Sequence, residues 1–355
     1  MKILLLGGSS FLGRAFASEA LARGHQVTTF NRGRSGTDLP GVRAVRGERG
    51  SADDLTALVE GRHWDAVVDT SAQQPEEAAL SARLLSGHVD HYTLVSSVHA
   101  FSGWGPQVVD EGSPLHPWSP DTPPEEVPYN ALKAGCELAV LERFGERSTI
   151  LNSGLLIGPH EIGGRLPWWL ERMARGGPVL APGDRGRTMQ PIDTRDFAAF
   201  GLDLLTAGRG GRYVTTAPPG HTTFGEFLDA CVRATGGGAE LVWVDEAPLL
   251  AEGPDQVQPW SELPLWAPDL PECAAIWLAD SSRAQAAGLR CRPVADTARD
   301  TWAWLRERGL GVDTDELGRK GREGGTRLGI APEKERRLLA AHSSGGNPAE
   351  ASGGG

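Results

Sequence analysis

Tyr129 and Lys133 are the two side chains whose types and spacing best suit chemistry in this chain. Residues four apart on a helix lie on one face, about one turn from each other. An ammonium group beside a phenol favours its ionised form, and acid/base work at neutral pH requires lowering a phenol pKa of about 10 by roughly 3 units, or ~4 kcal/mol. The pair therefore predicts a tyrosine that transfers a proton and a lysine that lowers its pKa.

A serine and a histidine add to this chemistry. The strand predicted at His91–Ser96 runs into Ser97, and ligands of open α/β sheets bind beyond the carboxyl ends of strands. Ser97 could there hydrogen-bond a substrate carbonyl while Tyr129 transfers the proton, although serines at a strand end can also form a simple turn. The imidazole of His99 titrates near neutral pH, so His99 is a further catalytic candidate or, alternatively, a structural histidine.

The start of the chain has the order of elements that a dinucleotide-binding turn requires. Lys2–Leu6 predicts a buried strand, Gly7-Gly8 a turn, and Phe11–Arg23 a helix that Gly24 ends. Glycines permit close backbone approach, and a helix N-terminus offers free N–H groups to a pyrophosphate. The alternative is a glycine turn without a ligand. The residues predicted to bind the cofactor here are Gly7, Ser9, Ser10, Phe11, Leu12 and Gly13.

The end of the second strand, Gln26–Phe30, indicates which nicotinamide cofactor is bound. NAD sites usually carry an acid here for the ribose 2′-hydroxyl, whereas an arginine accommodates a 2′-phosphate. Asn31, Arg32 and Arg34 follow the strand, and no carboxylate appears before Asp38. The sequence therefore favours NADP(H), with NAD(H) as the alternative if the arginines are only solvated loop charges.

Strands and helices then alternate along the chain. The predicted order is strand Val42–Val45, helix Ala52–Glu60, strand Asp65–Asp69, helix Glu76–Ser86 and strand His91–Ser96. Repeated β-α-β units indicate an α/β fold, a Rossmann-type doubly wound parallel sheet with a smaller C-terminal substrate-binding lobe. Glu48, in a loop on the adenine side, and Ser71, just after the strand Asp65–Asp69, complete the predicted cofactor site.

The predicted domain boundaries follow this pattern. Residues 1–157 form the NAD(P)-binding Rossmann domain, with later segments near 188–215 interleaved, and residues 158–310 form the lobe. In the tail, residues 311–355, a short helix is predicted at Ala331–His342, and the small polar residues from Ser343 onward are predicted to be disordered. In the lobe, a helix at Thr223–Thr235 is predicted to be capped by Thr222 or Thr223.

The chain resembles the extended or atypical short-chain dehydrogenases/reductases of the NAD-dependent epimerase/dehydratase family. The resemblance covers about Met1 to Leu310 and is carried by Gly7–Gly13, Leu94-Val95-Ser96-Ser97-x-x-x-Phe101, Tyr129-x-x-x-Lys133 and Gln190–Asp196. It implies that Ser97 polarises the substrate oxygen and that Tyr129 is the acid/base. It further implies that Lys133 tunes the tyrosine and binds the cofactor ribose.

Three departures from the family pattern limit which of the family's activities is expected. Ser10 replaces the middle glycine of the turn, and Phe101 stands where many sugar epimerases have tyrosine. The sugar-nucleotide 4,6-dehydratases follow the active-site hydroxyl with an Asp-Glu pair, where this chain has Val98-His99. Because those carboxylates supply the acid and base of the elimination, dehydratase activity is not expected.

Composition and charge limit the kinds of binding partner that are expected. The 355 residues carry a formal net charge of −11, which argues against a nucleic-acid partner. The four cysteines lie far apart without a Cys-x-x-Cys motif, so neither a metal site nor a disulfide framework is expected. The first apolar run is too short for a signal peptide or a membrane span, which favours a cytoplasmic enzyme without a membrane partner. Dimers are common in the resembled family, so a homodimer is an open expectation.

The C-terminal half is rich in tryptophan. The chain has eleven tryptophans and three tyrosines, and this half holds Trp168, Trp169, Trp243, Trp260, Trp266 and Trp277. Indoles suit flat or apolar ligands, which would fit an aromatic or polyketide-like substrate, but they also serve ordinary core packing. A sugar nucleotide would require cations, for which Arg165, Arg185 and Arg187 are candidates.

The sequence supports three hypotheses about function. The leading one is an NAD(P)(H)-dependent oxidoreductase that acts on a carbonyl or secondary alcohol of a small molecule, aromatic or sugar-derived. The second is a sugar-nucleotide epimerase with tightly retained NAD, in which the same residues oxidise and re-reduce the substrate. The third is a non-catalytic nucleotide sensor or RNA-associated member of the fold, since a fold does not fix a function.

Overall fold

The computed structural model describes residues 1–34, 36–122, 127–236, 238–308 and 328–345. The chain divides into two compact units. The first consists of Met1–Leu156, Gln190–His221 and Ala275–Arg292, and the second of Ile157–Met189, Thr222–Ala274 and the described residues after Arg292. The first unit therefore includes residues 275–292, which the sequence prediction assigned to the substrate lobe.

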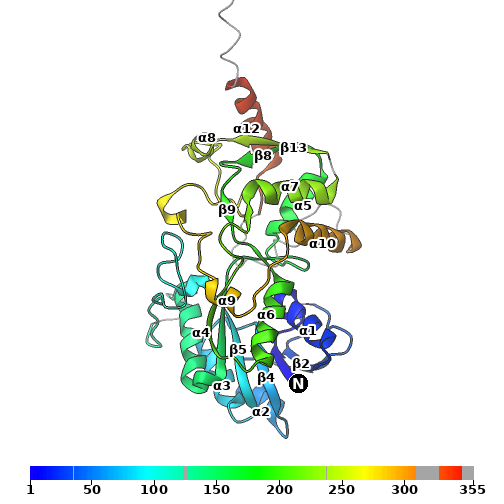
Figure 1. The fold of residues 1–355 in the computed structure, drawn as a ribbon, viewed down its shortest axis with the longest axis vertical. Helices are drawn as coiled ribbons and strands as arrows, with labels where there is room; N and C mark the ends of the chain where they lie inside the picture. The colour runs from blue at the N-terminus through cyan, green and yellow to red at the C-terminus, as the bar shows by residue number, and fades with distance from the viewer. Residues whose placement is uncertain (35, 123–126, 237, 309–327, 346–355) are drawn as a thin grey trace, which may run out of the picture. The chain divides into compact units, whose positions relative to one another are not determined.

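A seven-stranded sheet forms the centre of the first unit, in the order β11-β6-β5-β4-β1-β2-β3 (Figure 1). Every adjoining pair of strands is parallel, which confirms the predicted Rossmann-type doubly wound sheet. The strands are β1 (Lys2–Leu6), β2 (Gln26–Asn31), β3 (Arg43–Arg46), β4 (Trp64–Asp69), β5 (Val89–Ser97), β6 (Ser148–Ser153) and β11 (Gly211–Thr215).

Successive strand residues point to opposite faces of the sheet, and in the buried strands both sets are apolar. Helices therefore cover both faces. Ile3 and Leu5 of β1 pack on one face with helices α1 and α6, and Leu4 and Leu6 pack on the other with α2, α3 and α4. All four side chains are fully buried, which is worth roughly 1.5–3 kcal/mol each. The helices are α1 (Phe11–Ala22), α2 (Ala52–Val59), α3 (Pro75–Leu85), α4 (Tyr129–Phe144), α6 (Thr194–Thr206) and α9 (Ser282–Ala286).

The second unit is built from short strand pairs and helices. Strands β8 (Gly177–Pro182) and β13 (Ala239–Val244) are parallel, and β9 (Thr188–Met189) and β12 (Thr222–Thr223) are antiparallel. Thr223 caps helix α7 through a capping box with Glu226, as one of the two predicted caps. The helices are α5 (Arg165–Ala174), α7 (Phe224–Thr235), α8 (Glu246–Leu250), α10 (Val294–Glu307) and α12 (Pro332–Gly345). Strand β10 (Ile192–Asp193), of the first unit, pairs with β7 (Leu156–Ile157), where the chain passes from the first unit to the second. Among the described residues, the 3-10 helices η1 (Val98–Ala100) and η3 (Gly145–Arg147) lie in the first unit and η4 (Pro271–Cys273) in the second.

The predicted C-terminal helix is present as α12 and is held to its own unit by ion pairs. Glu335, which is buried, accepts hydrogen bonds from Arg172 Nε at 3.0 and 2.9 Å. Lys334 Nζ lies 2.6 Å from Glu262 Oε2. The helix continues to Gly345, so residues 343–345 are helical where the sequence predicted disorder; residues 346–355 lie outside the described part of the chain.

Four of the six tryptophans named above in the C-terminal half are buried in the interior. Trp168, Trp169, Trp266 and Trp277 are each 5 % exposed or less. Trp169 Nε1 donates to Pro264 O at 2.6 Å, and Trp266 Nε1 donates to Glu246 Oε1 at 3.1 Å. For these four the packing interpretation applies, because buried indoles offer no surface to a substrate.

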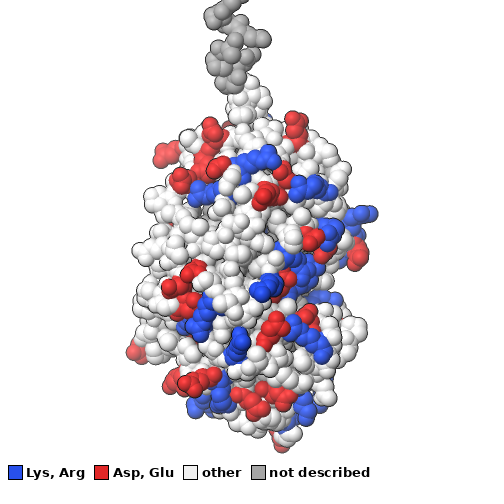
Figure 2. Space-filling model, viewed as in Figure 1, with Lys and Arg blue, Asp and Glu red and all other residues white. Residues whose placement is uncertain are grey.

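Acidic and basic side chains are interspersed over the face of the molecule shown in Figure 2. Among the described residues, no helix is both long and apolar enough to cross a membrane. The same residues contain no group of three histidine, cysteine or acidic side chains that could hold a metal ion.

Candidate functional site

The turn after β1 adopts backbone conformations that only glycine tolerates. Gly7 has φ +106° and Gly8 has φ +95°. A Cβ at Gly7 would lie 2.7 Å from Thr70 Oγ1, and one at Gly8 would lie 2.7 Å from Thr29 Cγ2. The sequence therefore needs both glycines to turn the chain from β1 toward α1.

Gly13 lets helix α1 approach this turn. A Cβ on Gly13 would lie 2.6 Å from Gly8 N, a backbone atom that cannot move aside. Ser10 is the N-cap residue of α1 and makes no side-chain cap hydrogen bond, while the Leu12 side chain packs in the apolar core. A cradle that a Cβ would fill, at the N-terminus of a twelve-residue helix, fits the pyrophosphate of a dinucleotide. Backbone N–H groups from Ser9 to Gly13 would hold it.

Asn31 ties the end of β2 to the glycine turn. Its Nδ2 donates to Gly7 O at 3.1 Å, and its Oδ1 accepts from Gly33 N at 2.8 Å. Asn31 thus holds the glycine turn in place from the neighbouring strand.

The two predicted 2′-phosphate arginines share an acidic neighbour. Arg32 Nε lies 3.8 Å and Arg34 Nη2 3.6 Å from the Glu48 carboxylate. All three side chains are at least half exposed, so these ion pairs are weak and open to exchange. The sequence predicted Arg32 and Arg34 at a 2′-phosphate and Glu48 in a loop on the adenine side. The structure places these three residues next to one another.

Asp38, to which the sequence analysis gave no role, is a further carboxylate near the end of β2. Asp38 forms an ion pair with Arg46 at the end of β3, and Arg46 Nη1 also donates to Asn31 Oδ1 at 2.8 Å. The hydrogen bond from Arg46 lowers the pKa of Asp38. No local spacing signals this contact, because a loop of variable geometry separates the two residues.

A buried ion pair lies beneath Ser71. Arg49 Nη1 and Nη2 donate to the two Asp69 oxygens at 2.8 and 2.9 Å, and Arg49 Nη1 also donates to Ser71 Oγ at 2.9 Å. Tyr92 Oη donates to Asp69 Oδ2 at 2.7 Å. Burial would raise the pKa of Asp69, but the charge and hydrogen bonds of Arg49 and the Tyr92 hydroxyl outweigh it and lower that pKa. The only sequence signal was a carboxylate at the end of an apolar strand.

Helix α4 presents the tyrosine and the lysine on one face. Tyr129 is its first residue and is 50 % exposed, whereas Lys133, one turn later, is buried. Lys133 Nζ lies 5.6 Å from the centre of the Tyr129 ring and donates to Ala72 O at 2.7 Å. Burial lowers the pKa of Lys133. The predicted pair is thus brought together beside the carboxyl ends of the strands.

Ser97 and His99 lie at the start of the same site. Ser97 Oγ accepts a hydrogen bond from His99 N at 3.2 Å, which leaves the serine O–H to donate. The His99 ring centre is 5.8 Å from that of Tyr129 and 4.0 Å from that of Trp104. The structure therefore places all four predicted catalytic residues in one region, and adds Trp104, which the sequence analysis had not singled out.

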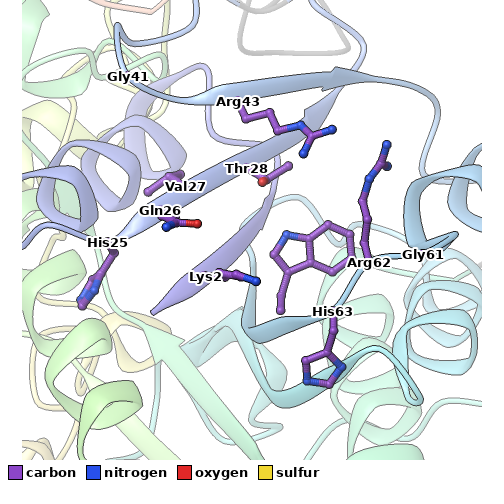
Figure 3. A pocket seen from close by; sticks show the side chains of 11 residues that line it. Lys2, His25, Gln26, Val27, Thr28, Gly41, Arg43, Gly61, Arg62 and His63 are labelled. Atoms are coloured by element: carbon purple, nitrogen blue, oxygen red, sulfur yellow. The ribbon is translucent and has the colours of Figure 1, made fainter.

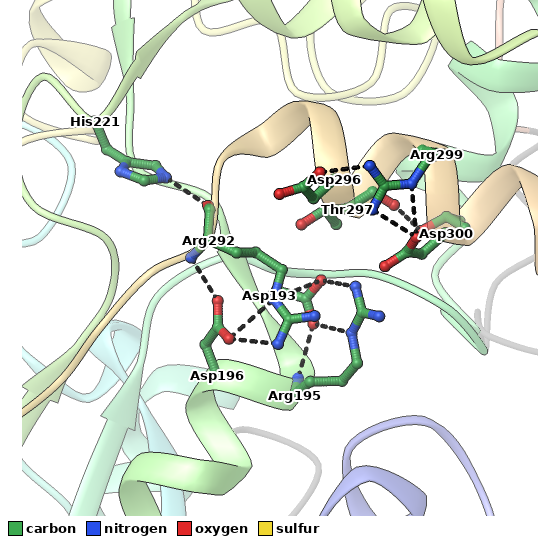
Figure 4. Close-up of polar contacts among 10 residues, drawn as sticks. Asp193, Arg195, Asp196, His221, Arg292, Asp296, Thr297, Arg299 and Asp300 are labelled. Atoms are coloured by element: carbon green, nitrogen blue, oxygen red, sulfur yellow. Dashed lines mark hydrogen bonds and ion pairs between the residues drawn. The ribbon is translucent and has the colours of Figure 1, made fainter.

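The Gln190–Asp196 motif connects two segments of the first unit through hydrogen bonds and ion pairs. Gln190 Nε2 donates to Ala279 O at 2.9 Å and Gln190 Oε1 accepts from Ala279 N at 2.8 Å. Arg292 Nη2 donates to Asp196 Oδ1 at 2.6 Å, next to the Asp193–Arg195 ion pair (Figure 4). These contacts fasten residues 275–292 to the segment that leads into α6, so the motif has a structural role.

A cavity of about 600 Å³ lies at the opposite ends of the strands. It opens at Lys2, Gln26, Arg43 and Trp64, the first residues of β1, β2, β3 and β4. Lys2, Arg43 and Arg62 point into this space (Figure 3). Because the glycine turn and Ser97 lie at the carboxyl ends, this cavity is separate from the candidate site.

Comparison with known proteins places this arrangement in a family. The model of the NAD dependent epimerase/dehydratase family matches residues 3–215. The 2'-dehydrokanamycin reductase of Streptomyces kanamyceticus is 31 % identical over 217 residues, which are 59 % of this chain and 59 % of that protein. The chloroplast stem-loop binding protein of 41 kDa b of Arabidopsis thaliana is 23 % identical over 250 residues, 66 % of this chain and 63 % of that protein. The chain thus spans about three fifths of the length of these two relatives.

Solved structures share the fold. UDP-glucose 4-epimerase from Thermotoga maritima, with UDP-glucose, superposes with a TM-score of 0.64 at 16 % identity, covering 87 % of this chain and 99 % of that one. UDP-glucose 4-epimerase from Thermus thermophilus, in complex with NAD, gives 0.61 at 20 % identity, covering 86 % and 99 %. At these identities the likeness concerns the fold.

Proposed function

Because this chain belongs to the NAD-dependent epimerase/dehydratase family, we propose that it is a reductase that uses NADP(H) to convert a ketone on a small, sugar-derived molecule to an alcohol. The observation that carries the proposal is a chain of contacts: Ser97 and Tyr129 both contact His99, and Lys133 lies beside Tyr129 and donates to Ala72, which follows the Ser71 that flanks the glycine turn. The identity to a protein named as a reductase supports net reduction, and the relatives' names suggest a sugar ketone.

Ser97 and Tyr129 carry out the proton chemistry of this reaction. The Ser97 hydroxyl, aligned by the His99 N–H, donates a hydrogen bond to the substrate carbonyl oxygen and stabilises the charge that develops there. The Tyr129 hydroxyl delivers a proton to the same oxygen as the carbon is reduced. A nicotinamide cofactor, held by the glycine turn, would supply the hydride. Tyr129 is half exposed and can therefore reach a substrate from solvent.

Lys133 favours the ionised form of Tyr129. Its ammonium is fixed by Ala72 O and lies within 6 Å of the phenol ring, where a positive charge stabilises the phenolate. His99 lies edge-on to the same ring, and a proton on its imidazole would act in the same direction. The Lys133 ammonium would therefore help Tyr129 to exchange its proton with the substrate oxygen.

The cofactor preference rests on the end of β2. Arg32 and Arg34 are exposed and can move from Glu48 toward a 2′-phosphate. A preference for NADPH over NADH of about tenfold or more, measured by fluorescence titration, is the expected result. Equal affinities would overturn the NADP(H) preference and leave a site that accepts either cofactor.

Removal of one hydroxyl tests the reaction. Tyr129→Phe should lower turnover about 10²- to 10⁴-fold in a panel of keto-sugars assayed by NADPH oxidation, with cofactor affinity unchanged. Tyr213→Phe, which removes a hydroxyl from β11, is the matched control and should keep full turnover. Equal turnover in the wild type and the Tyr129 variant would disprove the assignment.

An epimerase is the second candidate, which the UDP-glucose epimerase structures favour by fold. It would retain oxidised NAD⁺ through purification and consume no external NADPH. Denaturing the fresh protein and identifying any released nucleotide separates the two reactions. Stoichiometric NAD⁺ would replace the reductase proposal with the epimerase one.

A further inference from the structure

Glu137 is a buried carboxylate that the proposed proton chemistry does not use. It follows Tyr129 and Lys133 on α4 at the same spacing of four, so all three share one face of the helix. Its side chain is fully buried. Burying a carboxylate is costly unless it is paired and hydrogen-bonded, so its partners decide what it contributes.

The Glu137 carboxylate connects α4 to three neighbouring strands. Oε1 accepts hydrogen bonds from Ser96 Oγ on β5 and from Asn152 Nδ2 on β6, the latter at 2.6 Å. Oε2 pairs with Arg212 on β11. Strands β5, β6 and β11 are adjacent in the sheet, so one side chain fixes the helix against all of them.

Asn152 extends this connection to the serine of the site. Besides the bond to Glu137, its amide Nδ2 donates to Ser97 O at 3.1 Å, which uses both amide hydrogens. Ser96 and Asn152 are paired in register across β5 and β6, and Ser153 Oγ donates to Ser96 O at 3.0 Å. The amide therefore joins the helix that carries Tyr129 to the strand end that carries Ser97.

We propose that Glu137 and Asn152 are positioning residues that set the distance between Ser97 on β5 and the Tyr129–Lys133 face of α4; this rests on the reductase proposal for its catalytic meaning, but not for its geometry. A buried ion pair adds little net stability compared with apolar residues of the same volume. What the pair supplies here is a directional link, which apolar packing would not.

The test reads the position of Tyr129 directly. With 3-fluorotyrosine in the full chain, the Tyr129 fluorine signal, assigned by its loss in Tyr129→Phe, senses the ring of His99, which lies just after β5 and packs against Trp104. Asn152→Leu should shift or broaden this signal, since the link to Ser97 is lost. Glu137→Gln keeps an acceptor for Ser96 and Asn152 and should give a smaller change.

Val140→Ala provides the matched control, because Val140 is fully buried on the same helix but has no part in the network. It should lower the unfolding midpoint and leave the Tyr129 signal as in the wild type. If Asn152→Leu behaves like Val140→Ala, the positioning role is overturned and the network is only structural.

Turnover distinguishes this inference from the proposed function. Asn152→Leu should lower kcat with NADPH by up to about 10²-fold, with the Kd for NADPH unchanged, because only the geometry of the reacting groups changes. If Tyr129→Phe leaves turnover intact but Asn152→Leu still moves the fluorine signal, the reductase mechanism fails and the positioning role stands. If turnover depends on Tyr129 but the signal does not move, the reductase mechanism stands and the positioning role fails.

Discussion

Two buried arginine–carboxylate pairs support the carboxyl edge of the sheet, and the pKa values of their carboxylates are shifted in opposite directions. Asp69 pairs with Arg49 next to Ser71, and its pKa is lowered. Glu137 pairs with Arg212 on the helix that carries Tyr129 and Lys133, and burial raises its pKa because Arg212 and the hydrogen bonds offset only part of the cost. Both carboxylates are fully buried, so burial alone does not explain the difference.

The difference lies in how each arginine meets its carboxylate. Arg49 donates to both oxygens of Asp69 in a bidentate pair, to which Tyr92 and the Ser71 N–H add further donors. The Arg212 contact to Glu137 is through one nitrogen and one oxygen. A fork-shaped contact compensates the buried charge more fully, in agreement with the lowered pKa of Asp69 and the raised pKa of Glu137.

The largest expected effect follows from removing each arginine. Arg49→Met leaves the Asp69 carboxylate buried without its cation and should cost about 3–5 kcal/mol of unfolding free energy. Arg212→Met should cost clearly less, because Glu137 can take up a proton. Urea unfolding at pH 7, followed by circular dichroism, gives both values.

The control for both arginines is Arg43→Met, which removes an exposed arginine from β3 of the same unit. Its effect should stay within about 0.5 kcal/mol. Equal losses for the two buried arginines would contradict the view that the two pairs differ in charge compensation.

The sequence predicted the sheet, the glycine turn and the Tyr129–Lys133 pair, but it did not predict the buried arginine–carboxylate pairs. The apolar runs and the glycines indicated the sheet, because strand burial and positive φ angles leave local traces such as Gly7-Gly8. The spacing of Tyr129 and Lys133 indicated the helix face directly. Arg49 and Asp69 lie twenty residues apart, and nothing in the pattern of either segment shows that their side chains meet.

Glu137 also has a local signal, which the sequence analysis did not use. It stands one turn after Lys133 in a stretch that is otherwise mostly apolar, and helical spacing puts it on the same face as Lys133. Its partners Asn152 and Arg212 come from strands far along the chain, and only the three-dimensional pairing of β5, β6 and β11 brings them together. Local spacing therefore identifies a buried charge but not what satisfies it.

The two pairs should also differ in how stability depends on pH. The folded pKa of Asp69 lies below its ordinary 3.8, so its contribution is complete above that value and is lost as the pH falls through the folded pKa. The folded pKa of Glu137 lies above its ordinary 4.5, so its contribution is complete below 4.5 and is lost as the pH rises through the folded pKa.

Asp69→Asn and Glu137→Gln separate these effects when unfolding is measured from about pH 3 to pH 8. The stability difference between the wild type and Asp69→Asn should be constant at neutral pH and shrink below about 4. The difference for Glu137→Gln should instead become more favourable to the wild type as the pH falls toward 4.5. Slopes of the same sign would show that the two carboxylates are held alike.

The smallest effect concerns the exposed charges beside the buried Arg49–Asp69 pair. Glu48 lies 3.6 Å from Arg34 and 3.8 Å from Arg32, and exposed pairs of this kind are worth about 1 kcal/mol or less. If the arginines bind a 2′-phosphate, Glu48→Gln removes a competing anion and should raise the affinity for NADPH a few-fold while leaving that for NADH nearly unchanged. Fluorescence titration measures both affinities.

Glu142→Gln, an equal charge change at an exposed position near the end of α4, controls for net charge and should change neither affinity. A parallel loss of NADH and NADPH affinity in Glu48→Gln would instead place this carboxylate on the adenosine portion that both cofactors share. The arginines would then be solvated charges, and the adenosine side would owe its cofactor contacts to the glycine turn and to the residues held by Arg49. Because Glu48 lies within reach of both arginines, this single substitution distinguishes a phosphate-selective surface from one that accepts either cofactor.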